Sequence, residues 1–271
     1  MQSKKPIGIF DSGLGGLTTA RELMRVLPNE DIIYFGDTGR VPYGNKSVDT
    51  IIKYANQDAN FLLKNNVKAI IAACGTVSSI ARGLYDTLPV PYTGVLRPTA
   101  KSALKATKNG KIGVIGTTAT INSHSYQKHI AELSKDAWVF EQDCPLFVPL
   151  VENGFTDPED TVVSEVIRRY VEPLIQKGVD TLILGCTHYP ILKNAIAKVM
   201  GEGVTLVDSG RATALYTAEL LKSKNLLNHS KEEGTYKFFV SDTPHNFEHL
   251  AGVFLQKDIE GMVTQIDIEA Y

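Results

Sequence analysis

Short apolar runs alternate with longer segments of helical periodicity along the chain. The clearest helical faces consist of Ile51, Ala55, Ala59 and Leu62 and of Val163, Ile167, Val171 and Leu174. The short runs are continuously apolar, which predicts strands buried on both faces of a sheet. These runs cover residues 7–10, 32–35, 67–73, 92–96, 112–115, 138–141, 181–184, 204–207, 236–240 and 263–268. Their alternation with helices predicts an α/β fold with mostly parallel sheets.

The second half of the chain repeats the order of the first. Residues 7–10 are echoed by residues 112–115, and each half later has a buried run that ends at a cysteine. The repeat predicts two similar α/β domains related by a pseudo-twofold axis, with the active site in the cleft between them. We expect the first domain to comprise residues 1–97 and about 210–271, completed by the strand–helix–strand segment 235–268, and the second to comprise residues 98–209.

Composition narrows the classes of function. The 271 residues include 28 Lys+Arg and 30 Asp+Glu, a net charge of −2, which argues against nucleic-acid binding. Apolar stretches stay well short of the roughly 20 residues that a membrane span needs, and we expect neither a signal peptide nor a membrane partner. The three cysteines are an odd and sparse set, which predicts reduced thiols in a cytoplasmic protein.

Cys74 and Cys186 stand at matched places, each after a buried strand and before a predicted helix. Ligands of open α/β sheets bind beyond the carboxyl ends of the strands, and a helix N-terminus can lower a thiol pKa. Two opposed thiols suit a reaction in which one removes a proton from a carbon and the other returns one to the opposite face. A single buried cysteine is more often structural, but the matched pair favours catalysis. Cys144 has no counterpart, and we interpret it as structural.

Other polar residues lie near the same strand ends. Segment 10–17, Phe-Asp-Ser-Gly-Leu-Gly-Gly-Leu, fits neither nucleotide-binding glycine pattern, but its backbone N–H groups can hold a carboxylate. Asp11 and Ser12 either cap a helix or take part in the reaction, and the sequence leaves both interpretations open. The hydroxyls of Thr118 and Thr120 likewise either bind an anion or cap a helix.

His188 follows Cys186 by two residues. Zinc needs more ligands than one Cys-x-His pair supplies, so we expect no metal and interpret His188 as an acid/base or orienting group beside a thiol. Glu152 lies in a segment between elements, where sequence alone indicates only a solvated carboxylate.

From Ile7 to about Asp242, the chain resembles the glutamate racemases of the cofactor-independent aspartate/glutamate racemase superfamily. The motifs are Gly8-Ile-Phe-Asp11-Ser12-Gly13-Leu-Gly-Gly, Val41-Pro42-Tyr43-Gly44, Ala73-Cys74-x-Thr76 and Leu184-Gly-Cys186-Thr187-His188-Tyr189-Pro190. Two Cys-Thr motifs in this order, after an Asp-Ser-Gly start, make the resemblance specific.

The resemblance implies two thiol acid/base residues and no cofactor, pyridoxal phosphate included. Cys74 takes the α-proton from D-glutamate and Cys186 takes it from L-glutamate. Asp11 and His188 assist their respective thiols, with Glu152 as a second helper on the Cys186 side. The residues implied in substrate binding are Ser12, Tyr43, Gly44, Gly75, Thr76, Thr118, Thr120 and Thr187. The resemblance also implies a homodimer whose D-glutamate supplies peptidoglycan synthesis, and so cell-wall biogenesis and cell shape.

Two positions depart from the family pattern and leave alternatives open. Gly75 stands where the family generally has Asn, and Arg97 stands where many members have an acidic residue. The substrate could therefore be aspartate or another amino acid. A small-anion-binding relative without turnover is a second alternative, which the presence of both cysteines disfavours. A third is a hydrolase with Cys186 as nucleophile and His188 as base, which leaves Cys74 without a role.

Overall fold

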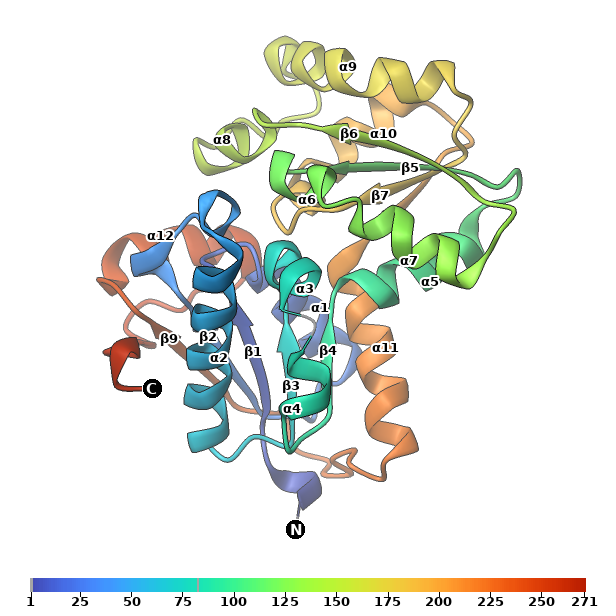
Figure 1. The fold of residues 1–271 in the computed structure, drawn as a ribbon. Helices are drawn as coiled ribbons and strands as arrows, with labels where there is room; N and C mark the ends of the chain where they lie inside the picture. The colour runs from blue at the N-terminus through green and yellow to red at the C-terminus, as the bar shows by residue number, and fades with distance from the viewer. Residues whose placement is uncertain (1, 82) are drawn as a thin grey trace. The chain divides into compact units, whose positions relative to one another are not determined.

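The computed structural model describes residues 2–81 and 83–271, which form two compact units (Figure 1). Unit 1 combines the chain up to Val95 with Thr213–Tyr271, and unit 2 is the continuous segment Leu96–Ala212. Each unit is built around its own sheet, and the strand pairs within both sheets run parallel. The predicted α/β fold with mostly parallel sheets is confirmed.

The sheet of unit 1 has the strand order β10-β9-β2-β1-β3-β4. Its strands are β1 (Ile7–Asp11), β2 (Ile32–Gly36), β3 (Ala69–Ala72), β4 (Tyr92–Gly94), β9 (Tyr236–Val240) and β10 (Val263–Gln265). The central strands β1, β2 and β3 are buried along their whole length, as continuous apolar runs predict. The C-terminal segment extends this sheet beside β2, as predicted, although its last strand ends at Gln265 and is followed by the 3-10 helix η5 (Ile268–Ala270).

Helices cover the sheet of unit 1. They are α1 (Leu17–Val26), α2 (Val48–Lys64), α3 (Gly75–Ile80), α4 (Leu84–Thr87), α12 (Pro244–Leu255) and the short 3-10 helices η1 (Gln2–Lys4), η2 (Thr38–Arg40) and η3 (Tyr43–Asn45). Helix α2 begins at Ser47, whose Oγ accepts the N–H of Thr50 at 3.3 Å. The apolar face predicted for α2 is buried, and the helix lies against β1 and β2, while α1 packs against α12 (Figure 1).

Unit 2 has a four-stranded sheet with the order β6-β5-β7-β8. Its strands are β5 (Lys111–Gly116), β6 (Trp138–Asp143), β7 (Thr181–Leu184) and β8 (Thr205–Asp208). Its helices are α5 (Leu96–Ala106), α6 (Thr118–Asn122), α7 (Ser125–Leu133), α8 (Phe147–Glu152), α9 (Thr161–Gln176), η4 (Tyr189–Leu192) and α10 (Lys193–Met200). Helix α11 (Ser209–Ser223) carries the chain from unit 2 into unit 1. The second predicted helical face, Val163 to Leu174, is the buried face of α9.

The described helices include none that is both long enough and apolar enough to cross a membrane.

A buried ion pair joins distant segments of unit 1 at the amino ends of its strands. Lys68 Nζ contacts Glu30 Oε2, and the two side chains are 1% and 2% exposed. Lys68 Nζ also donates to the carbonyl of Ser3 at 2.6 Å, and Glu30 Oε1 accepts the N–H of Asn228 at 2.8 Å. The pair therefore holds the N-terminal segment and the segment after α11 to the starts of β2 and β3.

We expect Lys68→Met to lower the free energy of unfolding by about 3–5 kcal/mol, because it leaves the Glu30 carboxylate buried without its countercharge. Lys68→Met combined with Glu30→Gln restores most of the loss, since the amide oxygen still accepts from Asn228. Urea unfolding followed by circular dichroism measures both variants. A single variant as stable as the parent protein would contradict this prediction.

Candidate active site

In unit 1, Asp11 and Cys74 lie at the carboxyl ends of neighbouring strands. Asp11 is the last residue of β1, and Cys74 follows β3 by two residues, directly before α3. The two strands are paired in register up to Phe10 and Ala72, and the N–H of Ala73 donates to the carbonyl of Phe10 at 2.9 Å. The parallel sheet thus brings together two residues that are far apart in the sequence.

Asp11 organises the glycine turn. Its Oδ2 accepts the N–H groups of Gly13 at 3.1 Å and of Gly16 at 3.0 Å. A Cβ atom at Gly16 would lie 2.5 Å from the Asp11 Cβ, so position 16 has no space for a side chain. The buried Tyr34 hydroxyl donates to the Gly13 carbonyl at 2.8 Å and fixes the other side of the turn. Asp11 therefore has a structural function in this turn, in addition to any chemical one.

The Cys74 thiol lies within this arrangement. Its Sγ donates to Ser12 Oγ at 3.5 Å, and the residue is 5% exposed. Burial and the negative charge of Asp11 raise the pKa of Cys74 to about 11, although hydrogen bonds from Ser12 and from the N–H groups of Val77 and Thr76 oppose the shift. The N–H groups at the start of α3 lower the pKa of Cys74, as expected of a helix N-terminus, but burial and the charge of Asp11 outweigh them. Near neutral pH, Cys74 holds its proton.

The other candidates of unit 1 lie around the start of α3 and in η3. Gly75 and Thr76 form the first turn of α3, half-buried next to Cys74. Tyr43 and Gly44 belong to η3, and the Tyr43 ring is part of the same buried cluster as Cys74. The Tyr43 hydroxyl, however, contacts Asp37 and Asp58. The structure thus brings Ser12, Asp11 and Cys74 together and engages the Tyr43 phenol elsewhere.

In unit 2, Cys186, His188 and Glu152 form a relay. Cys186 follows β7, and its half-buried Sγ lies 4.0 Å from His188 Nδ1. His188 Nε2 lies 3.1 Å from Oε1 of Glu152, the last residue of α8. The structure therefore gives Glu152, which sequence alone indicated to be a solvated carboxylate, a specific partner beside the thiol. One imidazole links a thiol to a partly exposed carboxylate.

The surroundings of His188 favour its charged form. Burial lowers the pKa of His188, but hydrogen bonds to Cys186 and Glu152, together with the charges of these groups, outweigh it and raise the pKa to about 10. Unit 2 therefore holds a thiol with a proton-carrying neighbour, whereas unit 1 holds a protonated thiol beside a carboxylate.

The threonine candidates of unit 2 have structural partners. Thr120 lies 3.0 Å from Thr117 through their hydroxyls, and Thr117, which sequence reasoning missed, caps α6. The Thr118 hydroxyl donates to Asp143 at 2.9 Å. Thr187 is 9% exposed and follows Cys186 directly. For Thr120 the structure shows the helix-capping arrangement that the sequence had left open beside anion binding.

Cys144 is fully buried, and its Sγ donates to the Gln142 carbonyl at 3.8 Å. Burial and the negative charge of Asp143 raise the pKa of its thiol. These surroundings agree with a structural role for Cys144. Among residues 2–81 and 83–271, no group of three or more His, Cys, Asp or Glu side chains is arranged to hold a metal ion.

Sequence reasoning also missed Tyr34, Asp37 and Asp58. Asp37 follows β2 directly, and its N–H donates to the Asp11 carbonyl at 3.0 Å. A signal for Asp37 was present, since an acidic residue after a buried strand is the same pattern that singled out Asp11. Asp58 lies in the middle of α2, where a carboxylate on a helix gives no such signal.

The comparisons with known proteins agree with this arrangement. The family model for Asp/Glu/Hydantoin racemase matches residues 32–217. The curated glutamate racemase of Geobacter metallireducens is 46% identical over 98% of this chain and 98% of its own. The crystal structure of Bacillus anthracis glutamate racemase isoform RacE1 is 39% identical, covers 97% of both chains and has a TM-score of 0.91. The Francisella tularensis glutamate racemase, solved in complex with D-glutamate, is 40% identical, with 99% of this chain and 100% of its own covered and a TM-score of 0.89. The resemblance found in the sequence is confirmed.

We expect Glu152→Gln to lower the pKa of His188, because the amide keeps a hydrogen bond but removes the negative charge. Since the pKa of His188 lies above the ordinary value of 6.5, its protonation stabilises the fold below that pH, and this stabilisation is lost as the pH rises through about 10. NMR titration of the histidine ring C–H signals measures the pKa. Glu159→Gln is the matched control, because Glu159 is an exposed carboxylate that pairs with Lys198. An unchanged titration of His188 in Glu152→Gln would refute the relay.

Proposed function

The chain belongs to the Asp/Glu/Hydantoin racemase family, and we propose that it interconverts L- and D-glutamate by proton transfer at Cα between two thiols. One observation carries the proposal: each unit presents a cysteine just beyond the carboxyl end of a strand, with its own polar partner. In the proposed reaction, Cys74 and Cys186 act on opposite faces of the same carbon.

The proposed reaction starts from L-glutamate at Cys186. The Cys186 thiolate takes the α-proton, assisted by His188, and the Cys74 thiol delivers its proton to the opposite face of Cα. The product is D-glutamate, and the enzyme is left with Cys186 as thiol and Cys74 as thiolate. The reverse reaction starts with that thiolate, assisted by Asp11. One proton is taken and one is given in each direction, so no electron-accepting cofactor enters the balance.

The protonation of the two half-sites supports this assignment. Burial and Asp11 raise the pKa of Cys74 to about 11, which keeps a proton ready for delivery in the L-to-D direction. The same shift makes the Cys74 thiolate a stronger base once it has formed, which suits the weakly acidic α-carbon of an amino acid. On the other side, the pKa of His188 is raised to about 10, which places a positive charge beside Cys186, the residue that we propose acts first.

We assign substrate binding to groups near the two thiols. In unit 1 these are Ser12, Gly75, Thr76 and the η3 residues Tyr43 and Gly44, and in unit 2 they are Thr118, Thr120 and Thr187. Because the hydroxyls of Tyr43 and Thr120 have partners within their own units, we assign η3 and the start of α6 to binding through backbone N–H groups. N–H and hydroxyl donors at the α-carboxylate stabilise the carbanion-like transition state.

We further propose a cytoplasmic homodimer whose D-glutamate supplies peptidoglycan synthesis, which supports cell-wall biogenesis and cell shape. Aspartate or another amino acid is the competing substrate. Gly75 offers no side chain to the substrate, and the exposed Arg97 at the start of α5 adds a positive charge that many relatives lack.

The test of this function is the exchange of the α-proton in D₂O, followed by proton NMR with L-glutamate, L-aspartate and L-alanine in separate samples without pyridoxal phosphate. We expect loss of the glutamate signal together with D-glutamate in chiral chromatography. Cys74→Ala and Cys186→Ala each abolish racemisation, because each removes one of the two proton-transfer groups. Cys144→Ala is the matched control and retains turnover, since the buried Cys144 thiol donates to the Gln142 carbonyl and is not one of the two proposed proton-transfer groups.

The possible outcomes separate the alternatives. Exchange with aspartate alone keeps the two-thiol mechanism and changes the substrate. Turnover in either Cys74→Ala or Cys186→Ala would refute the mechanism. A folded protein that exchanges none of the three amino acids would refute racemisation and leave the binding or hydrolase alternatives, of which the hydrolase predicts an acyl adduct on Cys186.

A further inference from the structure

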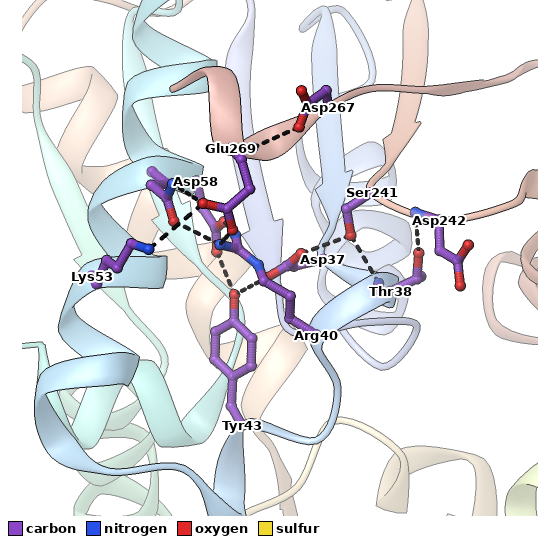
Figure 2. A network of polar contacts seen from close by, with 12 residues as sticks. Asp37, Thr38, Arg40, Tyr43, Lys53, Asp58, Ser241, Asp242, Asp267 and Glu269 are labelled. Atoms are coloured by element: carbon purple, nitrogen blue, oxygen red, sulfur yellow. Dashed lines mark hydrogen bonds and ion pairs between the residues drawn. The ribbon is translucent and has the colours of Figure 1, made fainter.

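Two fully buried carboxyl groups in unit 1 are not used by the proposed reaction. Asp37 and Asp58 are both 0% exposed, and the Tyr43 hydroxyl lies between them (Figure 2). Arg40 joins the group, with Nε 2.6 Å from Asp37 Oδ2 and Nη2 3.2 Å from Asp58 Oδ1. Ser241, just after β9, donates to Asp37 Oδ1 at 2.7 Å. We call Asp37, Arg40, Tyr43 and Asp58 the aspartate–tyrosine network.

Counting hydrogens defines the protonation of this network. The Tyr43 hydroxyl has one hydrogen, but its oxygen contacts Asp37 Oδ2 and lies 3.0 Å from Asp58 Oδ2. One of the two carboxyl groups must therefore carry a proton. Asp37 accepts from Arg40 and Ser241 as well, and burial together with the charge of Asp37 raises the pKa of Asp58 well above its usual range. For both contacts of the Tyr43 oxygen to be hydrogen bonds, we assign the proton to Asp58, so that Asp58 donates to Tyr43 and Tyr43 donates to Asp37.

The network lies beside the Cys74 half-site. The N–H of Asp37 donates to the carbonyl of Asp11 at 3.0 Å, so the network begins next to the residue that holds the glycine turn. At its other end, the Tyr43 ring belongs to the buried cluster that includes Cys74 and Val77. The 3-10 helix η3, which carries Tyr43, also contacts α3. A displacement of the Tyr43 phenol would therefore shift both the Asp11 backbone and the start of α3.

Further polar and charged side chains contact Arg40 on the solvent side of the network. Arg40 Nη1 lies 2.6 Å from Gln57 Oε1 and 3.2 Å from Glu269 Oε1, and its guanidinium stacks 3.9 Å from the Tyr54 ring centroid. Lys53 Nζ lies 3.6 Å from Glu269 Oε2 (Figure 2). Asp37, helix α2 and the C-terminal η5 thus hold Arg40 in one orientation. The network gives Tyr43 more partners than its burial requires, because a single hydrogen-bond partner satisfies a buried phenol hydroxyl.

We propose that Asp37, Arg40 and Asp58 are positioning residues for the reaction, which hold η3 through the Tyr43 phenol against the start of α3 and so shape the substrate side of the Cys74 half-site. The proposal rests on the proposed racemase function for its substrate, and on the contacts of unit 1 alone for the positioning. Within residues 2–81 and 83–271, the contacts of the Cys74 thiol include none with Asp37, Arg40 or Asp58. These three residues act through Tyr43 and through the Asp11 backbone.

The two carboxyl groups make an asymmetric and therefore sharp test. An asparagine at position 58 mimics a protonated carboxyl group, because its N–H donates to Tyr43 and its carbonyl accepts from Arg40. An asparagine at position 37 cannot replace a carboxylate that accepts from Tyr43, Arg40 and Ser241.

We expect Tyr43→Phe, Asp37→Asn and Asp58→Ala to raise the KM for glutamate about tenfold, the effect of losing one hydrogen bond to a charged group, with a much smaller change in kcat. Asp58→Asn restores the KM that Asp58→Ala loses.

A second readout does not depend on turnover. Iodoacetamide alkylation, followed by peptide mass spectrometry, gives the rates at Cys74 and Cys186 in the same sample. The three damaging variants speed alkylation of Cys74 several-fold, because a loosened η3 exposes the buried thiol, while Cys186 in unit 2 is the internal reference. Glu30→Gln is the matched control: it weakens a buried ion pair at the opposite end of the same sheet and leaves both KM and the ratio of alkylation rates unchanged.

The outcomes distinguish the two proposals. Variants that lose thermal stability but keep both the KM and the ratio of alkylation rates would show a merely structural network and overturn this inference. Equal damage from Asp58→Asn and Asp58→Ala would overturn the proton arrangement on which it is built. If the parent protein does not turn over glutamate, the proposed function fails, and the alkylation ratio still decides whether the network holds the Cys74 half-site.

Discussion

The buried carboxylate of Asp11 is the constraint on which the rest of unit 1 depends. A carboxylate that is 3% exposed at the end of a parallel strand must find hydrogen-bond donors, and the chain supplies them by turning back at once on itself. The N–H groups of Gly13 and Gly16 meet it, and position 16 must be glycine because a Cβ atom would collide with Asp11. This glycine turn also places Ser12 against Cys74. Asp11 thus explains the glycine at position 16 and, together with burial as the larger cause, the raised pKa of the Cys74 thiol.

The two half-sites solve opposite electrostatic problems with the same type of residue. In unit 1 the neighbour of the thiol is a carboxylate, which favours the neutral SH group. In unit 2 the neighbour is an imidazole whose protonated form is favoured by Cys186 and by Glu152. The reaction that we propose needs such an asymmetry at its start, because two thiols would have nothing to take the proton and two thiolates would have nothing to give.

The sequence predicted the features that depend on local pattern. Continuous apolar runs predicted the central strands, periodicity predicted the buried faces of α2 and α9, and the Cys-x-His spacing predicted that His188 lies beside Cys186. It could not predict effects set by burial and by contacts distant in sequence. A helix start after Cys74 indicated a lowered pKa, but the helix has six residues, and burial and Asp11 determine the result. The motif predicted a substrate contact for Tyr43. The Tyr43 hydroxyl contacts Asp37 and Asp58, and Asp58 lies fifteen residues further along the chain, in a different helix.

The charge balance among the buried carboxyl groups of unit 1 favours keeping one of them neutral. Asp11 and Asp37 are adjacent through a backbone hydrogen bond, and Arg40 is the cation in contact with Asp37. A third ionised carboxyl group, at Asp58, would add a buried negative charge close to both, and burial, the charge of Asp37 and, last, that of Asp11 raise the pKa of Asp58 accordingly. The proton that we assign to Asp58 removes this third charge and supplies the hydrogen for the contact between Asp58 and Tyr43, whose own hydrogen goes to Asp37. The hydrogen-bond pattern and the charge balance of the aspartate–tyrosine network therefore favour the same proton.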